Sequence, residues 1–343
     1  MIATGFAAGS EPKPELARQA VREAMAKLGV TVANSVLLFL TPPFTRNLQP
    51  TLRAVAGAGN CMHVVGCVAA GIFTEQHAAL KTPAVAAMVL SGEVNLQHQT
   101  SGLMLSLAAP DAVTAEWLSA ATQRFGAVSQ GGVWRHGKGL PVAACDVALQ
   151  GATGVMGVSQ GIEVLSEPQP ITAVQGHELV FVGGKPALQT LQQAFQHDTL
   201  DVSILSFNHV YACLADSLEA AQHGQYHLVN LVGANVANRS VMLAQAAEAG
   251  QWLCWAKAAA IEGGEKMTEA LMTELKHAPD FGLLFSCLGR GAGANGQNRD
   301  LSYLRQRFPA MPLIGLETEA VIAPVDGRNQ LLQHAAVLGL FHA

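Results

Sequence analysis

The sequence contains little charge, since only 13% of its 343 residues are Asp, Glu, Lys or Arg. The formal net charge is −5, and Lys and Arg do not gather in a cluster that could neutralise a row of phosphates. We therefore expect no nucleic-acid partner. Half of the residues are hydrophobic, which excludes a largely disordered chain and allows a sizeable buried core.

Long hydrophobic runs are also missing. The most apolar runs, such as residues 36–40, have the length of a strand and fall far short of the ~20 residues that a membrane helix needs. Residues 1–11 lack the basic and apolar regions of a secretory signal. We therefore expect a cytoplasmic protein without a membrane partner.

Closely spaced cysteines are absent as well. No Cys-x-x-Cys motif occurs, so the thiols are expected to be reduced and to form neither a disulfide framework nor a zinc site. The six cysteines are Cys61, Cys67, Cys145, Cys213, Cys254 and Cys287. The twelve histidines are dispersed too, and we expect no metal and no cofactor.

The pattern of apolar segments predicts a mixed α/β fold of the α+β kind, with layered sheets flanked by helices. A β-α-β unit is expected in residues 35–74 and a second one in residues 280–324. Both units have Leu-Leu-Phe in the first strand, at residues 37–39 and 283–285. We interpret them as a duplication with two pseudo-symmetric halves, and predict that the two units superpose.

A glycine-rich segment follows the first strand of the second unit. Successive amides in such a loop can form an anion-binding nest, and Arg290 adds a planar fork suited to a carboxylate or phosphate. Gly291, Gly293 and Gly296 form a G-x-G-x-x-G pattern, with Glu317 about 20 residues further on, as in a dinucleotide fingerprint. The other interpretation is a mobile connection with a solvated Arg.

Two thiols approach strand ends in the repeated units, Cys67 in the first and Cys287 in the second. Ligands of α/β sheets bind at such ends. A nucleophilic Cys also needs a base, and the sequence does not place His63 or His77 against either thiol. Glu317 and Glu319 alternate along the chain. One of the two carboxylates could contact a ligand ammonium while the other is solvated.

Several segments resemble the FIST family, the F-box and intracellular signal transduction domains. Residues 65–71 resemble its Gly-Cys-Ser-x-x-Gly step, and residues 285–291 are similar to its Phe-Ser-Cys-x-Gly-Arg-Gly step. Residues 159–187 resemble its central segment. The family has Gly-Glu-Ile steps where this chain has residues 71–73 and 320–322, so that both acidic residues are replaced.

The resemblance implies a sensory protein that binds a small ligand, such as an amino acid or another carboxylate, and signals through a separate protein. It implies a FIST N-terminal-like domain at residues 1–200 and a C-terminal-like domain at 201–343; a homodimer is compatible with it. The expected ligand-binding residues are Gly66, Cys67, Gly71, Ser286, Cys287, Gly289, Arg290, Gly291, Gly315, Glu317 and Glu319. A Cys-dependent or nucleotide-dependent small-molecule enzyme and a haem-binding sensor are the alternatives.

Overall fold

The chain folds into two compact units. The computed structural model describes residues 1–98, 102–137, 141–195, 210–222, 226–258, 263–290, 298–325 and 327–343. Unit 1 consists of Met1–Gln160 together with Ile261–Ala343, and unit 2 is Gly161–Ala260. Unit 2 is therefore inserted into the chain of unit 1. These units differ from the consecutive division at residues 200 and 201, which lie outside the described residues.

Unit 1 contains three repeats of one strand arrangement. The first repeat consists of β1 (Ile2–Ala8), α1 (Pro14–Leu28), β2 (Ser35–Leu40), η1 (Pro42–Asn47), α2 (Leu48–Gly59), β3 (Val64–Val68), β4 (Gly71–Thr74), β5 (Ala78–Leu80) and β6 (Ala84–Leu90). The middle repeat consists of β7 (Asn95–Gln97), β8 (Leu103–Ala108), η2 (Pro110–Ala112), α3 (Ala115–Ser119), β9 (Gln123–Val128), β10 (Val133–Trp134) and β11 (Ala144–Gln150). The third repeat consists of β12 (Thr153–Gln160), α6 (Gly263–Leu275), β21 (Phe281–Cys287), η4 (Leu288–Arg290), α7 (Arg299–Arg307), β22 (Leu313–Thr318), β23 (Val321–Val325), β24 (Arg328–Leu332) and β25 (Ala335–His342).

Strand pairing is the same in all three repeats. The second and third strands are parallel, and the last strand lies antiparallel between the first and the second, in the orders β1-β6-β2-β3, β7-β11-β8-β9 and β12-β25-β21-β22. The predicted mixed α/β fold of sheets flanked by helices is thereby confirmed. The two predicted β-α-β units belong to the first and third of three repeats within unit 1, and not to two halves of the chain. The sequence did not reveal the middle copy, because its crossover helix α3 has only five residues.

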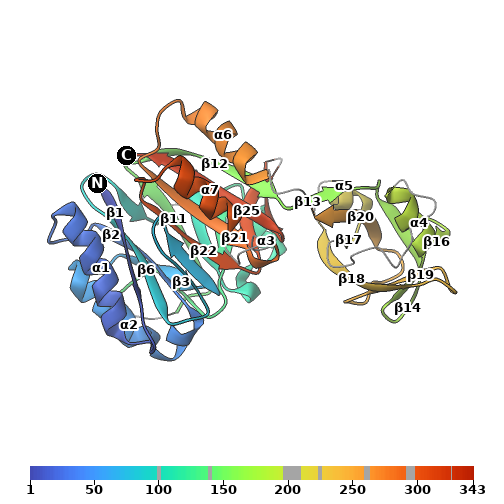
Figure 1. Ribbon diagram of the computed structural model, residues 1–343, viewed down its shortest axis with the longest axis horizontal. Coiled ribbons are helices and arrows are strands. Elements are labelled where there is room, and N and C mark those ends of the chain that lie inside the picture. Colours follow the sequence, from blue (N-terminus) through green and yellow to red (C-terminus); the bar gives the residue numbers. More distant parts are fainter. Residues whose placement is uncertain are drawn as a thin grey trace. The chain divides into compact units, whose positions relative to one another are not determined.

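Each repeat also donates a strand to another repeat. The third strand of a repeat would be an open sheet edge, and exposed edges invite unwanted pairing. β10 covers β3, β4 covers β22, and β23 covers β9, all in antiparallel pairs. The three sheets are consequently linked in a closed cycle, and their strands are seen with the helices that cover them in Figure 1.

Helices cover the outer faces of the first and third sheets. α1 begins with Pro14 in its first turn and ends at Gly29, whose φ of 66° is the left-handed conformation that glycine adopts at a helix C-terminus. Its buried stripe packs on the first sheet with α2, and the stripe consists of Ala17, Ala20, Val21, Ala24 and Met25. α6 and α7 form the corresponding layer on the third sheet.

The inner faces of the three sheets form one central apolar core. Phe39, Phe125 and Phe285 come from the first, middle and third repeats. The Phe285 ring packs edge-on against both others, with ring centroids 6.1 Å apart in each pair. The centre of unit 1 is thus filled by side chains.

Unit 2 is an antiparallel barrel. Its elements are β13 (Ile162–Val164), β14 (Gln169–Gln175), β15 (Glu178–Val182), β16 (Lys185–Pro186), α4 (Ala187–Ala194), β17 (Val210–Ala215), α5 (Leu218–Gln222), β18 (His227–Asn235), β19 (Ser240–Leu243) and β20 (Trp252–Ala258). The order β20-β14-β15-β19-β18-β17 closes because β17 also pairs with β20. Trp255 fills the barrel core, and its Nε1 donates a hydrogen bond of 3.0 Å to Thr190 Oγ1 on α4.

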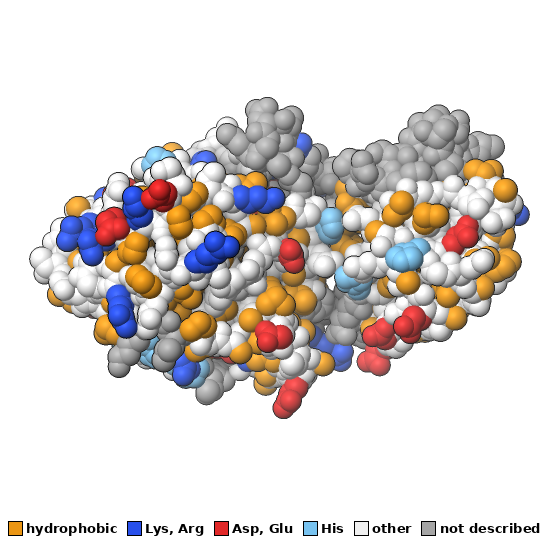
Figure 2. All heavy atoms as spheres, turned by 90° about the horizontal axis from the view of Figure 1, so that it is seen from below, with side chains coloured by type: hydrophobic (Ala, Val, Ile, Leu, Met, Phe, Trp, Pro, Cys, Tyr) orange, Lys and Arg blue, Asp and Glu red, His pale blue; other side chains and the backbone are white. Residues whose placement is uncertain are grey.

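None of the helices in the described part of the chain is both long enough and apolar enough to span a membrane. Figure 2 shows one face of the molecule, on which basic and acidic side chains are scattered among hydrophobic and neutral ones. This face offers no continuous basic stripe along its described residues, in agreement with the mildly negative charge of the sequence.

Equivalent glycines lie on the third strand of each repeat. A Cβ atom at Gly66 would lie 1.7 Å from the carbonyl oxygen of Leu38 on the parallel strand beside it. The corresponding distances are 1.9 Å at Gly126 and 2.1 Å at Gly315. Only glycine lets the two backbones approach so closely, which gives Gly66 and Gly315 a packing role whether or not they also bind a ligand.

Replacing Gly66 by alanine should destabilise unit 1 by about 3 kcal/mol or more, because the added methyl group meets backbone rather than a movable side chain. Gly57→Ala is the matched control. Gly57 lies in α2 with open space around it, so alanine there should stabilise the protein by about 0.5–1 kcal/mol. Thermal unfolding followed by circular dichroism measures both variants. Equal melting temperatures would contradict the close approach.

Candidate functional site

The ends of β21 and β22 bring several predicted residues together. Ser286 is the register partner of Glu317, and Gly71 on β4 pairs with Glu317 from the other side. A Cβ atom at Gly71 would lie 2.6 Å from Glu317 Oε2, so the glycine leaves room for the carboxylate. Asn298 Nδ2 donates a hydrogen bond of 2.9 Å to Glu317 Oε1. Glu317 is therefore a half-buried acid at a strand end, and its role as a ligand contact stays a prediction.

Arg290 binds groups of its own chain. Its Nε and Nη2 donate to the Asp300 carboxylate at 2.6 and 3.1 Å. Nη1 and Nη2 donate to the carbonyl and hydroxyl oxygens of Ser159 at 2.8 and 2.7 Å. The guanidinium expected to receive an anionic ligand thus already holds a carboxylate from α7, and its ligand-binding role stays a prediction.

This ion pair lies where the chain leaves and re-enters unit 1. Ser159 is near the end of β12, directly before unit 2, and Gly264 is in the first turn of α6, directly after it. A Cβ atom at Gly264 would lie 1.9 Å from Asp300 Oδ1, so α6 begins in close contact with the ion pair. Arg290 and Asp300 therefore anchor both connections to unit 2 on the unit 1 side.

The two thiols of the predicted cleft are buried. Cys67 is 0% exposed in the central core, and burial raises the pKa of its thiol. Cys287 donates from Sγ to the carbonyl oxygen of Glu319 at 2.8 Å. Burial raises the pKa of Cys287 as well, although the backbone amides of Gly289 and His334 are among the groups that lower it. Thiols with raised pKa values are poor nucleophiles, which does not favour the Cys-dependent enzyme.

The duplication does not place these thiols at equivalent positions. Cys67 lies on the third strand of the first repeat, and Cys287 ends the second strand of the third repeat. The residue that corresponds to Cys67 is Leu316. Cys67 follows Gly66 and Leu316 follows Gly315, the equivalent glycines at which the parallel strands approach closely.

The remaining predicted residues lie around the same strand ends. Gly289 packs against the imidazole of His334. A Cβ atom added at Gly289 would lie 2.8 Å from the His334 ring. Burial lowers the pKa of His334, and a backbone hydrogen bond with Gly289 partly offsets this. Glu319 is exposed. Gly291, with the rest of the G-x-G-x-x-G pattern, lies outside the described residues.

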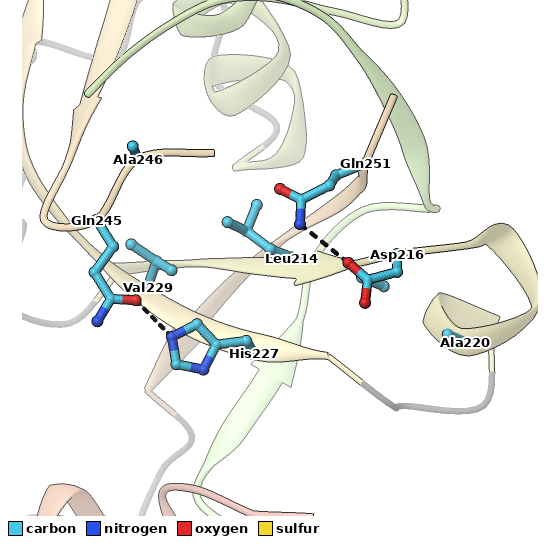
Figure 3. A pocket seen from close by; sticks show the side chains of 9 residues that line it. Leu214, Asp216, Ala220, His227, Val229, Gln245, Ala246 and Gln251 are labelled. Carbon is cyan, nitrogen blue, oxygen red and sulfur yellow. Dashed lines mark hydrogen bonds between the residues drawn. The ribbon is translucent and has the colours of Figure 1, made fainter. Parts of the chain in front are cut away.

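Unit 2 contains a pocket with a volume of about 350 Å³ at one mouth of the barrel. Its lining combines apolar side chains with four polar ones (Figure 3). The lining residues are Leu214, Ala215, Asp216, Ala220, His227, Val229, Gln245, Ala246 and Gln251. None of the ligand-binding residues expected from the sequence is among them.

The polar groups of the pocket form two hydrogen-bonded pairs, both visible in Figure 3. Gln251 Nε2 donates to Asp216 Oδ1 at 3.1 Å, and His227 Nε2 lies 2.7 Å from Gln245 Oε1. A carbonyl oxygen can only accept, so in this pair Nε2 of His227 carries the hydrogen. Donors and acceptors are therefore both available to a ligand.

Sequence reasoning missed these pocket residues for a physical reason. Asp216 follows β17, His227 begins β18, Gln245 follows β19 and Gln251 precedes β20. They meet only because closure of the barrel brings these strand ends to one mouth, and no local motif marks that closure. For Asn298 and Asp300 a signal existed: Asn at a helix N-cap and Asp in the first turn are typical of a helix start.

Comparison with known protein families identifies the class of this protein. Residues 187–324 match the model of the FIST C domain. The match covers less than half of the chain, and over this range it confirms the resemblance to the FIST family that was stated from the sequence. The match runs from α4 in unit 2 to β23 in unit 1, so the family domain does not coincide with a compact unit. The FIST N-terminal part stays a prediction.

Uncharacterized relatives match the chain over almost its entire length. Uncharacterized protein Rv0628c of Mycobacterium tuberculosis is 26% identical over 380 residues, covering 99% of this chain and 99% of the relative. Uncharacterized protein Mb0898c of Mycobacterium bovis is 24% identical over 367 residues, covering 95% of each. Unit 2 lies within the matched length.

Replacing Arg290 by alanine should destabilise the protein by about 3–5 kcal/mol, because the Asp300 carboxylate would be left buried and unpaired. The side chains of this pair are 11% and 7% exposed. Arg307→Ala is the control, since the Arg307–Glu269 pair is 43% and 50% exposed and should contribute less than about 1 kcal/mol. Urea unfolding measures both. If Arg290→Ala is as stable as the control, Arg290 is available to a ligand instead.

Proposed function

We propose that this protein is a sensor of a small amine-bearing molecule, such as an amino acid, which binds in the pocket of unit 2. The observation that carries the proposal is the convergence of one carboxylate, two amides and an imidazole beside Leu214 and Val229 in about 350 Å³. Ligand sites commonly combine an apolar lining with a few polar groups that fix orientation.

Asp216 gives the pocket its preference for a cation. It is the acidic residue of the lining, and its side chain is at the exposed rim. An ionised carboxylate has about four lone-pair sites, so the hydrogen bond from Gln251 leaves room for a ligand ammonium. The pairing of an ammonium with Asp216 would be charge-assisted, which makes it the strongest single contact that the pocket offers.

The amides supply the complementary contacts. Gln245 accepts from His227 through Oε1, so its Nε2 can donate to a ligand carboxylate or carbonyl. Val229 and Leu214 in the lining can contact an aliphatic side chain. A molecule with an ammonium, a carboxylate and a short apolar group would satisfy these groups together, which supports an amino acid as the ligand class.

The signal is proposed to pass from unit 2 to a separate protein through unit 1. The chain connects the two units through β12 and α6, and the Arg290–Asp300 pair binds the first element and packs against the second. A change in the barrel that displaces either connection would act directly on this buried ion pair. The FIST C domain spans both units, in agreement with a role that needs both.

Asp216→Asn should weaken binding of an amino acid about 10- to 100-fold, the effect of losing one charge-assisted hydrogen bond. The measurement is calorimetric titration of a panel that pairs each amino acid with the 2-hydroxy acid of the same carbon frame. Wild type should prefer the amino acid, and Asp216→Asn should lose that preference. Glu163→Gln, at an exposed acid of the same unit, is the control and should bind as wild type does.

Two results would contradict this proposal. One is a wild-type protein that binds amino acids and hydroxy acids with the same affinity, since Asp216 would then not recognise the amine. The other is unchanged affinity in Asp216→Asn. The ligand would then bind elsewhere, and Glu317 at the strand ends of unit 1 would be the next candidate contact.

A further inference from the structure

Two cysteines face each other across the strand pair that closes the barrel. Cys213 on β17 and Cys254 on β20 are direct register partners in an antiparallel ladder. Side chains of directly opposed residues leave the sheet on the same face. The Cα atoms of such partners lie about 4.5 or 5.5 Å apart, depending on the hydrogen-bonding of the pair. Both separations fall within the range of about 4.4–6.8 Å that a disulfide spans.

The thiols lie together in a small cluster on the outer side of β17 and β20. Cys213 and Cys254 are both buried there, with Tyr211 and Ala256 beside them, whereas Ala212 and Leu253 point into the barrel core. Both cysteines are free. No backbone movement is needed to bring the two sulfurs to the same side of the sheet.

The other described cysteines are not arranged in this way. Cys67 pairs in register with Phe39 and Val133, and Cys145 pairs with Leu107 in a different sheet. Among the strand pairs of the described residues, only Cys213 and Cys254 place two cysteines opposite each other. The geometry for a cross-link is therefore specific to this pair.

We propose that Cys213 and Cys254 are a redox-sensitive modification site, which hydrogen peroxide converts from the dithiol to a disulfide and which a thiol reductant converts back. One thiolate attacks the peroxide oxygen, the O–O bond breaks, and the sulfenic acid and one water form. The second thiolate attacks the sulfenic sulfur and releases the second water. Two thiols and one hydrogen peroxide thus give one disulfide and two waters, and the two electrons go to the peroxide.

Burial slows oxidation of the pair, so that both thiols stay reduced until hydrogen peroxide reacts with them. It raises the pKa of Cys254 to about 11 and that of Cys213 further. Glu167 raises the pKa of Cys254 as well, the charge of Cys254 raises the pKa of Cys213, and both thiols raise the pKa of Tyr226. Since the thiolate is the reactive form, oxidation should become about tenfold faster per pH unit between pH 7 and 9.

The test treats the reduced full-length protein with hydrogen peroxide, blocks the remaining thiols with an alkylating reagent, and maps the peptides without reduction. We expect one cross-linked peptide that contains Cys213 and Cys254, four alkylated cysteines out of six, and complete reversal by dithiothreitol. Cys213→Ala and Cys254→Ala should each lose the cross-link. Cys61→Ala should keep it, because Cys61 lies in unit 1.

The wild-type protein alone decides the outcome, so the proposal does not depend on the folding of a variant. Six alkylated thiols after peroxide treatment would overturn it. So would stepwise oxidation of one cysteine to sulfinic acid without a cross-link, or a cross-link between Cys67 and Cys145 formed as fast as the expected one. None of these results depends on whether the pocket binds an amino acid.

Discussion

Unsatisfied sheet edges determine how unit 1 is built. Each repeat alone would leave the backbone groups of its third strand unpaired, and a buried unpaired group is costly. The exchange of β4, β10 and β23 between repeats pairs all three edges at once. Side chains strengthen the exchange at the strand ends, where Ser129 donates to the carbonyl oxygen of Val68 and Thr318 to that of Val128. The three repeats are therefore joined through their backbones.

The cycle also explains where an insertion is tolerated. The first repeat connects its first strand to α1 through a short link, and the third repeat carries all of unit 2 at the same place, between β12 and α6. The insertion leaves the strand pairing of the third repeat intact. The Arg290–Asp300 pair secures both ends of the inserted chain. Arg290, which the sequence placed in an anion-binding loop, thus has a structural role.

The barrel carries both proposed functions of unit 2 on one strand pair. The pocket lies at the end of β17 and the start of β20, and Cys213 and Cys254 face each other further along the same two strands. Ligand recognition there rests on Asp216 and three neutral polar side chains, while redox chemistry rests on thiols that burial keeps protonated. The two sites differ in exposure, and each can be tested without the other.

The sequence by itself determined the α/β class, the two β-α-β units and the identity of the FIST C domain. Long apolar strands with the Leu-Leu-Phe pattern are local signals, and they were sufficient for β2 and β21. It also listed Gly71, Ser286 and Glu317 in one expected ligand site, and the structure makes Glu317 the register partner of both other residues. Only the tertiary structure decided the partner of Arg290, the middle repeat and the pocket. These depend on contacts between residues far apart in the chain: Arg290 meets Ser159 across 131 positions, and Asp216 meets Gln251 only when the barrel closes.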